Sequence, residues 1–385
     1  MRVLFACTRG AGHFQPMVPF IDACRRGGND VLVVGAPSLA DTVQRAGYPF
    51  ASGAAPPEDQ LGEVWARVPT LSYEDAERLV VGEIFATLNV RAMLPDMRSA
   101  VRRWRPDVIL REPAEFASAV VAEEEGVAHV QVGIGLAVSH MQMESLATEA
   151  VERWGPGLTQ RIAATPYLTL FPASLEDPEA AGPRRAHRFR DPAAEAPARP
   201  LTDWWPGDDR PLVYVTFGSV TASVPAAAPI YDVALEAVAG LPARVLMTTG
   251  EAMDQGRLSA PGPHVHVARW VAQAEVLGHA RVVVCHGGSG TTLGALAAGV
   301  PLVVTPLFAD QPQNGRRVAA VGAGVVVDAG DEGAVRSAVD PAELRDAIAT
   351  VVADDAYIRA AAGIASDIRE LPPADEVLTL LADVA

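Results

Sequence analysis

A histidine followed by a glycine-rich turn ends a buried apolar run, within the segment VVVCHGGSGTTLGALAAGVPLVVTP at residues 282–306. The apolar run predicts a strand, and the residues after the turn predict a helix. Missing side chains in such a turn let a ligand approach the backbone, while the helix directs unpaired N–H groups and its positive dipole end toward that ligand. This arrangement favours an anion, most simply a phosphate. We expect the phosphate to be held by His286 together with Gly288, Ser289, Gly290 and Thr291.

Other interpretations of this turn fit less well. A strand-to-helix turn that binds nothing needs only one or two glycines. A phosphate loop of the G-x-x-x-x-G-K type requires a lysine after the glycines, and none is present. A serine-hydrolase elbow, G-x-S-x-G, would require glycine where Thr291 stands. No D-x-D triplet occurs, so a metal ion held by carboxylates is not indicated.

A second candidate is His13, which follows the turn Gly10-Ala11-Gly12 at the carboxyl end of the first expected strand. Ligands of open parallel sheets lie at this edge, and a neutral imidazole can take a proton from a substrate. The same turn invites comparison with the dinucleotide motif G-x-G-x-x-G. Here Gln15 occupies the third glycine position, and the second strand ends in glycine and alanine rather than in an acid for a ribose. An NAD-dependent oxidoreductase is therefore the weaker interpretation of this turn.

Two sets of apolar runs alternate with helical patterns and predict an α/β protein with two doubly wound, Rossmann-like domains facing across a cleft. We place the domains at residues 1–200, with a linker from Pro172 to Pro211, and at residues 201–385. A terminal helical stretch from Asp355, broken at Pro372-Pro373, is expected to cross back to the first domain. The predicted strands are 2–8, 30–35, 107–111, 129–133, 211–219, 243–249, 265–267, 281–286 and 301–306.

Composition limits the classes of partner. The formal net charge of the 385 residues is −16, which disfavours nucleic acid because phosphate-backbone binding needs a basic face. The three cysteines have no metal-type spacing and suit free buried thiols in a reducing compartment. The long uncharged run from Gly287 to Ala309 is interrupted by prolines, so no membrane span is expected. We expect a cytoplasmic protein.

The segment RWVAQAEVLGHARVVVCHGGSGTTLGALAAGVPLVVTPLFADQPQNGRRV, residues 269–318, resembles the nucleotide-sugar signature of the inverting GT-B glycosyltransferases of family 1. About fifty contiguous residues match with the right spacing, and the remaining layout agrees: an amino-terminal strand with G-x-G-H, a linker, then FGS. The form is closest to actinobacterial enzymes that glycosylate macrolide, enediyne or aromatic polyketide natural products. The resemblance implies a GT-B fold and sugar transfer from a nucleoside diphosphate.

Carried over to this sequence, the resemblance implies a role for each matching residue. Trp270 would stack on the base and the Val271 backbone would pair with its edge, whereas Ala272 departs from the usual proline. The diphosphate would be held by Ser219 and the segment from His286 to Thr291, and the sugar hydroxyls by Asp310 and Gln311. His13 would be the general base, oriented by Glu112, where aspartate is commoner. Trp270 as a cap of the core, Asp310 as a turn acid and Glu112 as a surface acid are the alternatives.

The expected activity is thus a metal-independent, inverting transfer of a sugar to a hydroxyl of a small hydrophobic acceptor. The resemblance favours a deoxysugar and thymidine diphosphate (TDP) over uridine diphosphate (UDP). We expect no cofactor beyond the nucleotide-sugar donor. A catalytically silent nucleotide-sugar-binding protein of the same fold is the alternative, and the oligomeric state, including a homodimer, is left open.

Overall fold

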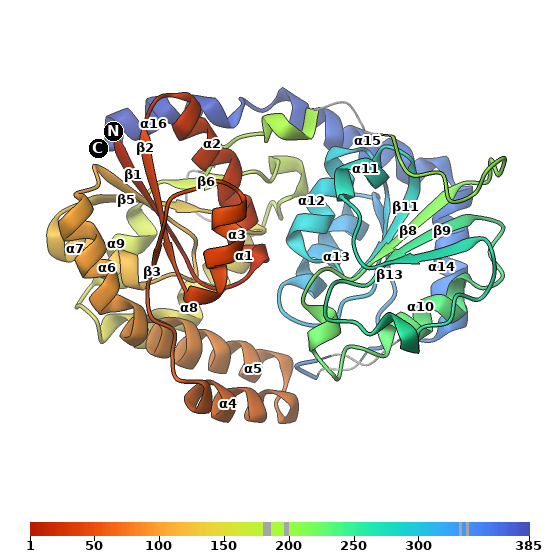
Figure 1. Cartoon of the computed structure of the whole chain (residues 1–385), viewed down its shortest axis with the longest axis horizontal. Helices are drawn as coiled ribbons and strands as arrows, with labels where there is room; N and C mark the ends of the chain where they lie inside the picture. Colours follow the sequence, from red (N-terminus) through yellow and green to blue (C-terminus); the bar gives the residue numbers. More distant parts are fainter. Residues whose placement is uncertain (180–185, 196–199, 331–332, 336–338) are drawn as a thin grey trace. The chain divides into compact units, whose positions relative to one another are not determined.

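The computed structural model describes residues 1–179, 186–195, 200–330, 333–335 and 339–385, and divides the chain into two units (Figure 1). Unit 1 comprises Met1–Ala193 together with Leu371–Ala385, and unit 2 comprises Ala194–Glu370. The division falls at residues 193/194, where the sequence led us to expect 200/201. Of the terminal stretch that was expected to return, residues 371–385 belong to unit 1, whereas residues 355–370 belong to unit 2.

Unit 1 is built on a parallel seven-stranded sheet with the order β3-β2-β1-β4-β5-β6-β7. Short β-branched runs form its central strands, which are buried on both faces. The order reverses between β1 and β4, as in dinucleotide-binding folds. The strands are β1 (Arg2–Cys7), β2 (Asp30–Gly35), β3 (Phe50–Ser52), β4 (Val108–Arg111), β5 (Ala128–Val132), β6 (Tyr167–Thr169) and β7 (Ala186–Arg188).

Helices cover both faces of this sheet (Figure 1). One face packs against η4, a π-helix, and against α6 to α9, which together enclose a core that includes Leu4, Ala6 and Ile109. The principal helices are α1 (Ala11–Phe14), α2 (Val18–Arg26), α3 (Ala40–Arg45), α4 (Glu58–Arg67), α5 (Tyr73–Leu79), η4 (Val80–Asn89), α6 (Val90–Trp104), α7 (Ala117–Glu125), α8 (Ala137–Glu152), α9 (Leu158–Ala164) and α16 (Val377–Val384).

Unit 2 repeats the same strand order in a parallel six-stranded sheet, β10-β9-β8-β11-β12-β13. Its strands are β8 (Leu212–Thr216), β9 (Arg244–Thr248), β10 (Val265–Ala268), β11 (Ala280–Cys285), β12 (Leu302–Val304) and β13 (Gly324–Val326). Its helices are α10 (Ile230–Val238), α11 (Gln273–Leu277), α12 (Ser289–Ala297), α13 (Gln311–Ala320), α14 (Pro341–Ala353) and α15 (Asp355–Glu370). The reversal here lies between β8 and β11.

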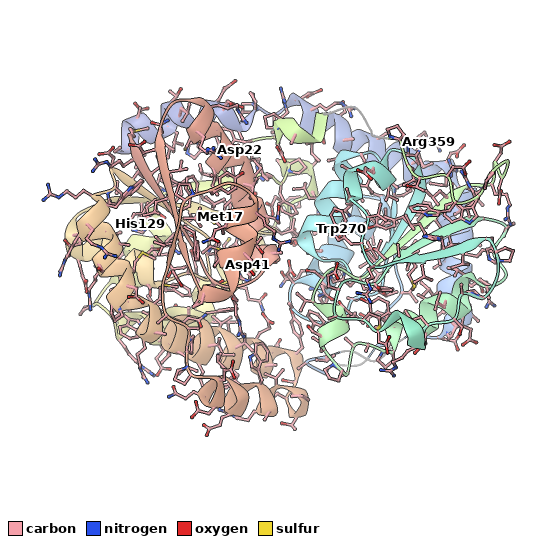
Figure 2. The ribbon with its side chains drawn as sticks, in the orientation of Figure 1. Met17, Asp22, Asp41, His129, Trp270 and Arg359 are labelled. Atoms are coloured by element: carbon pink, nitrogen blue, oxygen red, sulfur yellow. The ribbon has the colours of Figure 1, made fainter. Side chains whose placement is uncertain are left out.

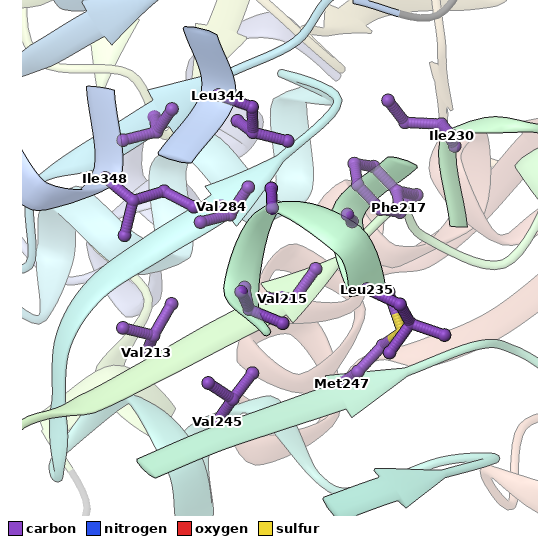
Figure 3. Packing of buried hydrophobic residues seen from close by; sticks show 14 of the residues in the cluster. Val213, Val215, Phe217, Ile230, Leu235, Val245, Met247, Val284, Leu344 and Ile348 are labelled. Atoms are coloured by element: carbon purple, nitrogen blue, oxygen red, sulfur yellow. The ribbon is translucent and has the colours of Figure 1, made fainter. Parts of the chain in front are cut away.

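The core of unit 2 lies between one face of the sheet and helices α10 and α14 (Figure 3). Val215 and Val284 from adjacent strands pack with Leu235 of α10 and Ile348 of α14. Removing this apolar surface from water stabilises the unit and holds the strand ends in place. The sheet therefore acts as a rigid support for the loops that follow β8 and β11.

Four short strands, β3, β6, β7 and β13, were not predicted. Each has three residues, too few for a periodic pattern to stand out. β6 precedes the expected linker and β7 lies inside it, so part of that segment extends the sheet of unit 1. Residues 180–185 and 196–199, also in the expected linker, lie outside the described residues.

The C-terminal segment is held to unit 1 by side-chain and backbone hydrogen bonds. Arg26 of α2 donates two hydrogen bonds to Asp375, at 2.7 and 2.9 Å. The backbone of Arg190 pairs with the segment around Pro373, donating to Pro372 and accepting from Ala374. These contacts explain why residues 371–385 belong to unit 1.

Two further expectations can be compared with the structure. Cys7, Cys24 and Cys285 are free and buried, as predicted. In the part of the chain that the structure describes, no helix has both the length and the apolar character that crossing a membrane would require.

Candidate functional site

His13 lies just beyond the carboxyl end of β1, on the four-residue helix α1. Gly10 precedes the helix with a φ of 103°, a backbone conformation that residues with a Cβ rarely adopt. The carbonyl of Gly10 then accepts hydrogen bonds from the N–H groups of His13 and Phe14. The glycine turn thus brings the chain back over the strand end and places the imidazole above the point where the strand order reverses.

Glu112, which follows β4, is brought together with His13 as the resemblance implied. Nδ1 of His13 lies 3.2 Å from Oε2 of Glu112, and the carboxylate is completely buried. Oε1 accepts hydrogen bonds from the Thr8 hydroxyl at 2.7 Å and the Thr8 N–H at 3.0 Å, and Oε2 accepts one from the Ala114 N–H at 2.7 Å. Glu112 is therefore not a surface acid. Thr8 contributes to this site, and sequence reasoning did not identify it.

Two buried carboxyl groups at this strand end have pKa values shifted in opposite directions. Burial raises the pKa of Glu112, but the neighbouring His13 charge and hydrogen bonds from His13 and Thr8 outweigh it, so the pKa of Glu112 is lowered. Burial dominates at Glu115 and raises its pKa, although Ser118 donates to it. The partner of His13 is thus the carboxyl group whose surroundings favour the ionised form.

The π-helix η4 borders His13. The ring centroids of His13 and Phe85 lie 5.9 Å apart, with the planes tilted by 57°. Trp154 donates from Nε1 to the Ala86 carbonyl at 2.8 Å, which ties η4 to the turn that follows α8. The imidazole therefore has a carboxylate on its Nδ1 side and an aromatic ring beside it.

In unit 2, His286 follows β11 and is enclosed by two glycines. A Cβ at Gly288 would lie 2.5 Å from Nε2 of His286, and a Cβ at Gly218, which follows β8, would lie 3.0 Å from Cε1. Burial lowers the pKa of His286 to about 4, so the ring is neutral near neutral pH. Its Nδ1 has no hydrogen-bond partner among the described residues.

Helix α12 begins at Ser289, three residues after this histidine, as expected. Its N-cap, Gly288, provides no side-chain hydrogen bond, and the first helical bond runs from the Thr292 N–H to the Gly288 carbonyl at 3.0 Å. The N–H groups of Ser289, Gly290 and Thr291 therefore have no acceptor inside the helix. These groups and the helix dipole suit an anion.

Asp310, the N-cap of α13, lies next to this helix start. The Ser289 hydroxyl donates to Oδ2 of Asp310 at 2.6 Å, so in this structure the hydroxyl proton is directed to Asp310. Nδ2 of Asn314 lies 3.0 Å from Oδ2 of Asp310 and 3.0 Å from Oγ of Ser289. Sequence reasoning missed Asn314, because nothing local in the helix marks it. The signal available was its position four residues after Asp310, which puts both on one helix face.

Gln311 is buried, and its side chain holds the preceding loop. Its Oε1 accepts hydrogen bonds from the N–H groups of Leu307 and Phe308, at 2.9 and 3.0 Å. A glutamine amide has one carbonyl oxygen and one NH₂ group. The NH₂ group is consequently the part of Gln311 that could donate to a sugar, and the expected sugar contact stays a prediction.

Trp270 lies in the loop between β10 and α11 and is 70% exposed (Figure 2). This exposure contradicts the alternative that it caps the core, and an exposed indole offers a face on which a flat ring can stack. Val271 beside it is partly buried, and Ser219 is exposed in the loop after β8. The stacking, base-pairing and phosphate roles expected for these residues stay predictions.

Comparison with known proteins covers nearly the whole chain. Residues 22–165 match the family model described as the erythromycin biosynthesis protein CIII-like N-terminal domain, and residues 232–384 match the corresponding C-terminal domain. Elloramycin glycosyltransferase ElmGT of Streptomyces olivaceus is 34% identical over 395 residues, covering 97% of this chain and 95% of that protein. L-demethylnoviosyl transferase of Streptomyces niveus is 33% identical over 334 residues, covering 84% of each chain.

Solved structures share the fold. Glycosyltransferase SsfS6 of Streptomyces sp. SF2575, complexed with thymidine diphosphate, superimposes with a TM-score of 0.74. The alignment covers 100% of this chain and 99% of that one, at 23% identity. The fold predicted from the sequence is therefore confirmed.

We predict opposite effects of alanine at two glycines two residues apart. In Gly288→Ala the new methyl group would displace the His286 ring, and we expect a loss of about 1–3 kcal/mol in the free energy of unfolding. Gly290→Ala has no neighbouring atom within 4 Å and lies in α12, where alanine should add up to about 1 kcal/mol. Urea titration of both variants measures the difference, and equal stabilities would contradict the close packing around His286.

We also predict pH dependences of opposite sign for Glu112 and Glu115. The lowered pKa of Glu112 contributes stability above its unfolded pKa that is lost as the pH falls through its folded value. The difference in the free energy of unfolding between the wild type and Glu112→Gln should therefore become smaller in acid. Because the pKa of Glu115 is raised in the folded state, the wild type loses stability as the pH rises from the unfolded pKa to the folded one. The free energy of unfolding of Glu115→Gln should therefore increase relative to that of the wild type as the pH rises.

Urea unfolding followed by a probe in unit 1, from about pH 3 to about pH 8, tests both trends. The two variants serve as each other's control, since both remove one buried carboxyl group from the same strand end. Parallel curves for the two variants would show that the charges are not arranged as described.

Proposed function

Since the chain belongs to the erythromycin biosynthesis protein CIII-like family of glycosyltransferases, we propose that it transfers a deoxysugar from TDP to a hydroxyl group of a small apolar acceptor, with His13 as the general base. The enzyme class follows from the family, whereas the donor, the acceptor and the residue roles are proposed. The observation that carries the proposal is the pairing of His13 with the buried, ionised Glu112.

Glu112 suits the task of orienting His13. Its oxygens are held by the Thr8 side chain, the Thr8 backbone and the Ala114 backbone, so the carboxylate cannot rotate without breaking three hydrogen bonds. With Nδ1 of His13 directed at Glu112, Nε2 is assigned to the acceptor proton. The ionised carboxylate also stabilises the imidazolium that forms when the proton arrives.

The proposed reaction is a single displacement. As Nε2 of His13 takes the proton, the acceptor oxygen forms a bond to the anomeric carbon on the face opposite the diphosphate. The bond between that carbon and the phosphate oxygen breaks, and the diphosphate leaves with the electron pair, so the anomeric configuration inverts. Holding the two reactants in line supplies much of the rate enhancement in such displacements.

The start of α12 is proposed to receive the departing charge. Three backbone N–H groups without an acceptor inside the helix, the helix dipole and the neutral His286 ring can donate to diphosphate oxygens. Ser219 is proposed to assist them, and Asp310 and Gln311 are proposed to bind the sugar. We propose that no metal ion takes part in the reaction, because these donors can stabilise the negative charge on the leaving diphosphate.

The nucleotide and the acceptor are proposed from the relatives. A similar fold has been solved with thymidine diphosphate, and the two relatives described above transfer sugars in Streptomyces species. The exposed Trp270 supports stacking on a base. The Phe85 ring beside His13 supports an apolar acceptor at that point of unit 1.

The experiment that tests this proposal is calorimetric titration of the purified protein with TDP, UDP and NAD, without added metal. We expect TDP to bind more tightly than UDP and NAD not to bind. Binding of NAD alone would reject the proposal and favour the oxidoreductase. Binding of TDP without turnover of any TDP-sugar across an acceptor panel would favour the silent nucleotide-sugar-binding protein.

Two alanine variants should separate proton transfer from donor binding. We expect His13→Ala to lower kcat by about 100- to 10,000-fold while leaving the Kd for TDP unchanged, because general base catalysis typically contributes that much. His286→Ala should instead raise the Kd for TDP. Steady-state kinetics together with calorimetry distinguish these results, and the reverse pattern would contradict the assigned roles.

A further inference from the structure

Asn314 lies in the second turn of α13 and is buried, with 1% of its surface exposed. Its Nδ2 is within hydrogen-bond distance of three oxygen atoms: the Gly287 carbonyl at 2.8 Å, Oγ of Ser289 at 3.0 Å and Oδ2 of Asp310 at 3.0 Å. The first two belong to the turn before α12 and to its first residue, and the third belongs to the start of α13. One amide group therefore joins two loops that follow different strands.

The chemistry of the neighbours determines the orientation of this amide. A carbonyl oxygen and a carboxylate oxygen can only accept hydrogen bonds, so the NH₂ group must face Gly287 and Asp310. The opposite atom, Oδ1, is buried and has no hydrogen-bond partner among the residues that the structure describes. Leaving a buried polar atom unpaired costs stability. An apolar side chain would avoid that cost, but it would leave the Gly287 carbonyl and Asp310 without the donor that the amide supplies.

These contacts fix how Asp310 is presented. Oδ2 receives the Ser289 hydroxyl proton and lies beside the Asn314 amide, so Oδ1 is the carboxylate oxygen left for a ligand. The contact with the Gly287 carbonyl ties the same amide to the turn that opens α12. A shift of the carboxylate relative to the helix start would break at least one of these bonds.

We propose that Asn314 is a positioning residue of the donor site. It sets the distance and angle between the carboxylate of Asp310 and the N-terminus of α12, so that the sugar and the diphosphate of one donor are bound together. This inference rests on the proposed function, in which Asp310 contacts the sugar and α12 contacts the diphosphate. A residue that only stabilised α13 would weaken the binding of the bare nucleotide and of the nucleotide sugar equally.

The test uses the ratio of two dissociation constants, that of TDP divided by that of a TDP-sugar. The ratio isolates the contribution of the sugar from that of the nucleotide. Calorimetry of the full chain with TDP, TDP-glucose and TDP-rhamnose, without acceptor, gives it for whichever sugar nucleotide binds more tightly. The variants are Asn314→Ala, Asp310→Ala and the double variant. Arg316→Ala, an exposed change on the same helix, is the matched control, and thermal unfolding checks that each variant is folded.

We expect Asn314→Ala to lower the ratio by about tenfold, as loss of hydrogen bonding to a charged group typically does. Asp310→Ala should lower it at least as much, and the double variant should match Asp310→Ala, because Asn314 acts through Asp310. The Arg316→Ala control should keep the wild-type ratio. As a second donor-deficient variant of the same size, Asn314→Asp should also lower the ratio, since it sets a carboxylate against Oδ2 of Asp310.

Three results would overturn the inference. In the first, Asn314→Ala weakens TDP and the TDP-sugar by the same factor. In the second, the two single effects multiply in the double variant. In the third, the wild type binds neither sugar nucleotide more tightly than TDP, which removes the sugar contact on which the inference depends. Failure of the wild type to bind TDP at all is a different result, and it would reject the proposed function itself.

Discussion

The reversal of strand order in each parallel sheet is the constraint on which the rest of the structure depends. The order reverses between β1 and β4, and again between β8 and β11, and in open parallel sheets this is where loops leave toward opposite sides and ligands bind. Residues far apart in the chain meet there. Thr8 and Glu112 are hydrogen-bonded across 104 residues, and Gly218 lies against the ring of His286. Each unit thus places a histidine at its own reversal point.

The surroundings of each group decide its charge at these points. Glu112 and Glu115 are three residues apart and both are buried, yet only at Glu112 do the His13 charge and the hydrogen bonds from His13 and Thr8 outweigh burial and lower the pKa. Burial likewise keeps His286 neutral, because no anionic neighbour in the described structure opposes its effect on the pKa. His13, the proposed base, therefore has an acid beside it, whereas His286, the proposed diphosphate ligand, does not.

The sequence predicted those parts of the fold and site that depend on local patterns. Central strands were found because runs such as DVLVVG are apolar on both faces, and the α12 turn was found because glycines and a histidine stand together. β7 was missed because its three residues, Ala186–Arg188, carry no apolar pattern. Asn314 and Thr8 were missed for a different reason: each also has a partner in a distant part of the chain, Ser289 for Asn314 and Glu112 for Thr8, and only the fold brings them together.

The return of residues 371–385 to unit 1 affects how this protein could be recombined with a relative. The chain passes from one unit to the other twice, near residue 193 and near residue 370. A chimera joined at the first passage alone would combine α2 from one parent with α16 from the other. The Arg26–Asp375 pair, and the place beside Gly27 where Leu378 packs, would then depend on two unrelated sequences. Exchange of a whole unit requires both junctions, so the terminal helix must be inherited together with the amino-terminal half.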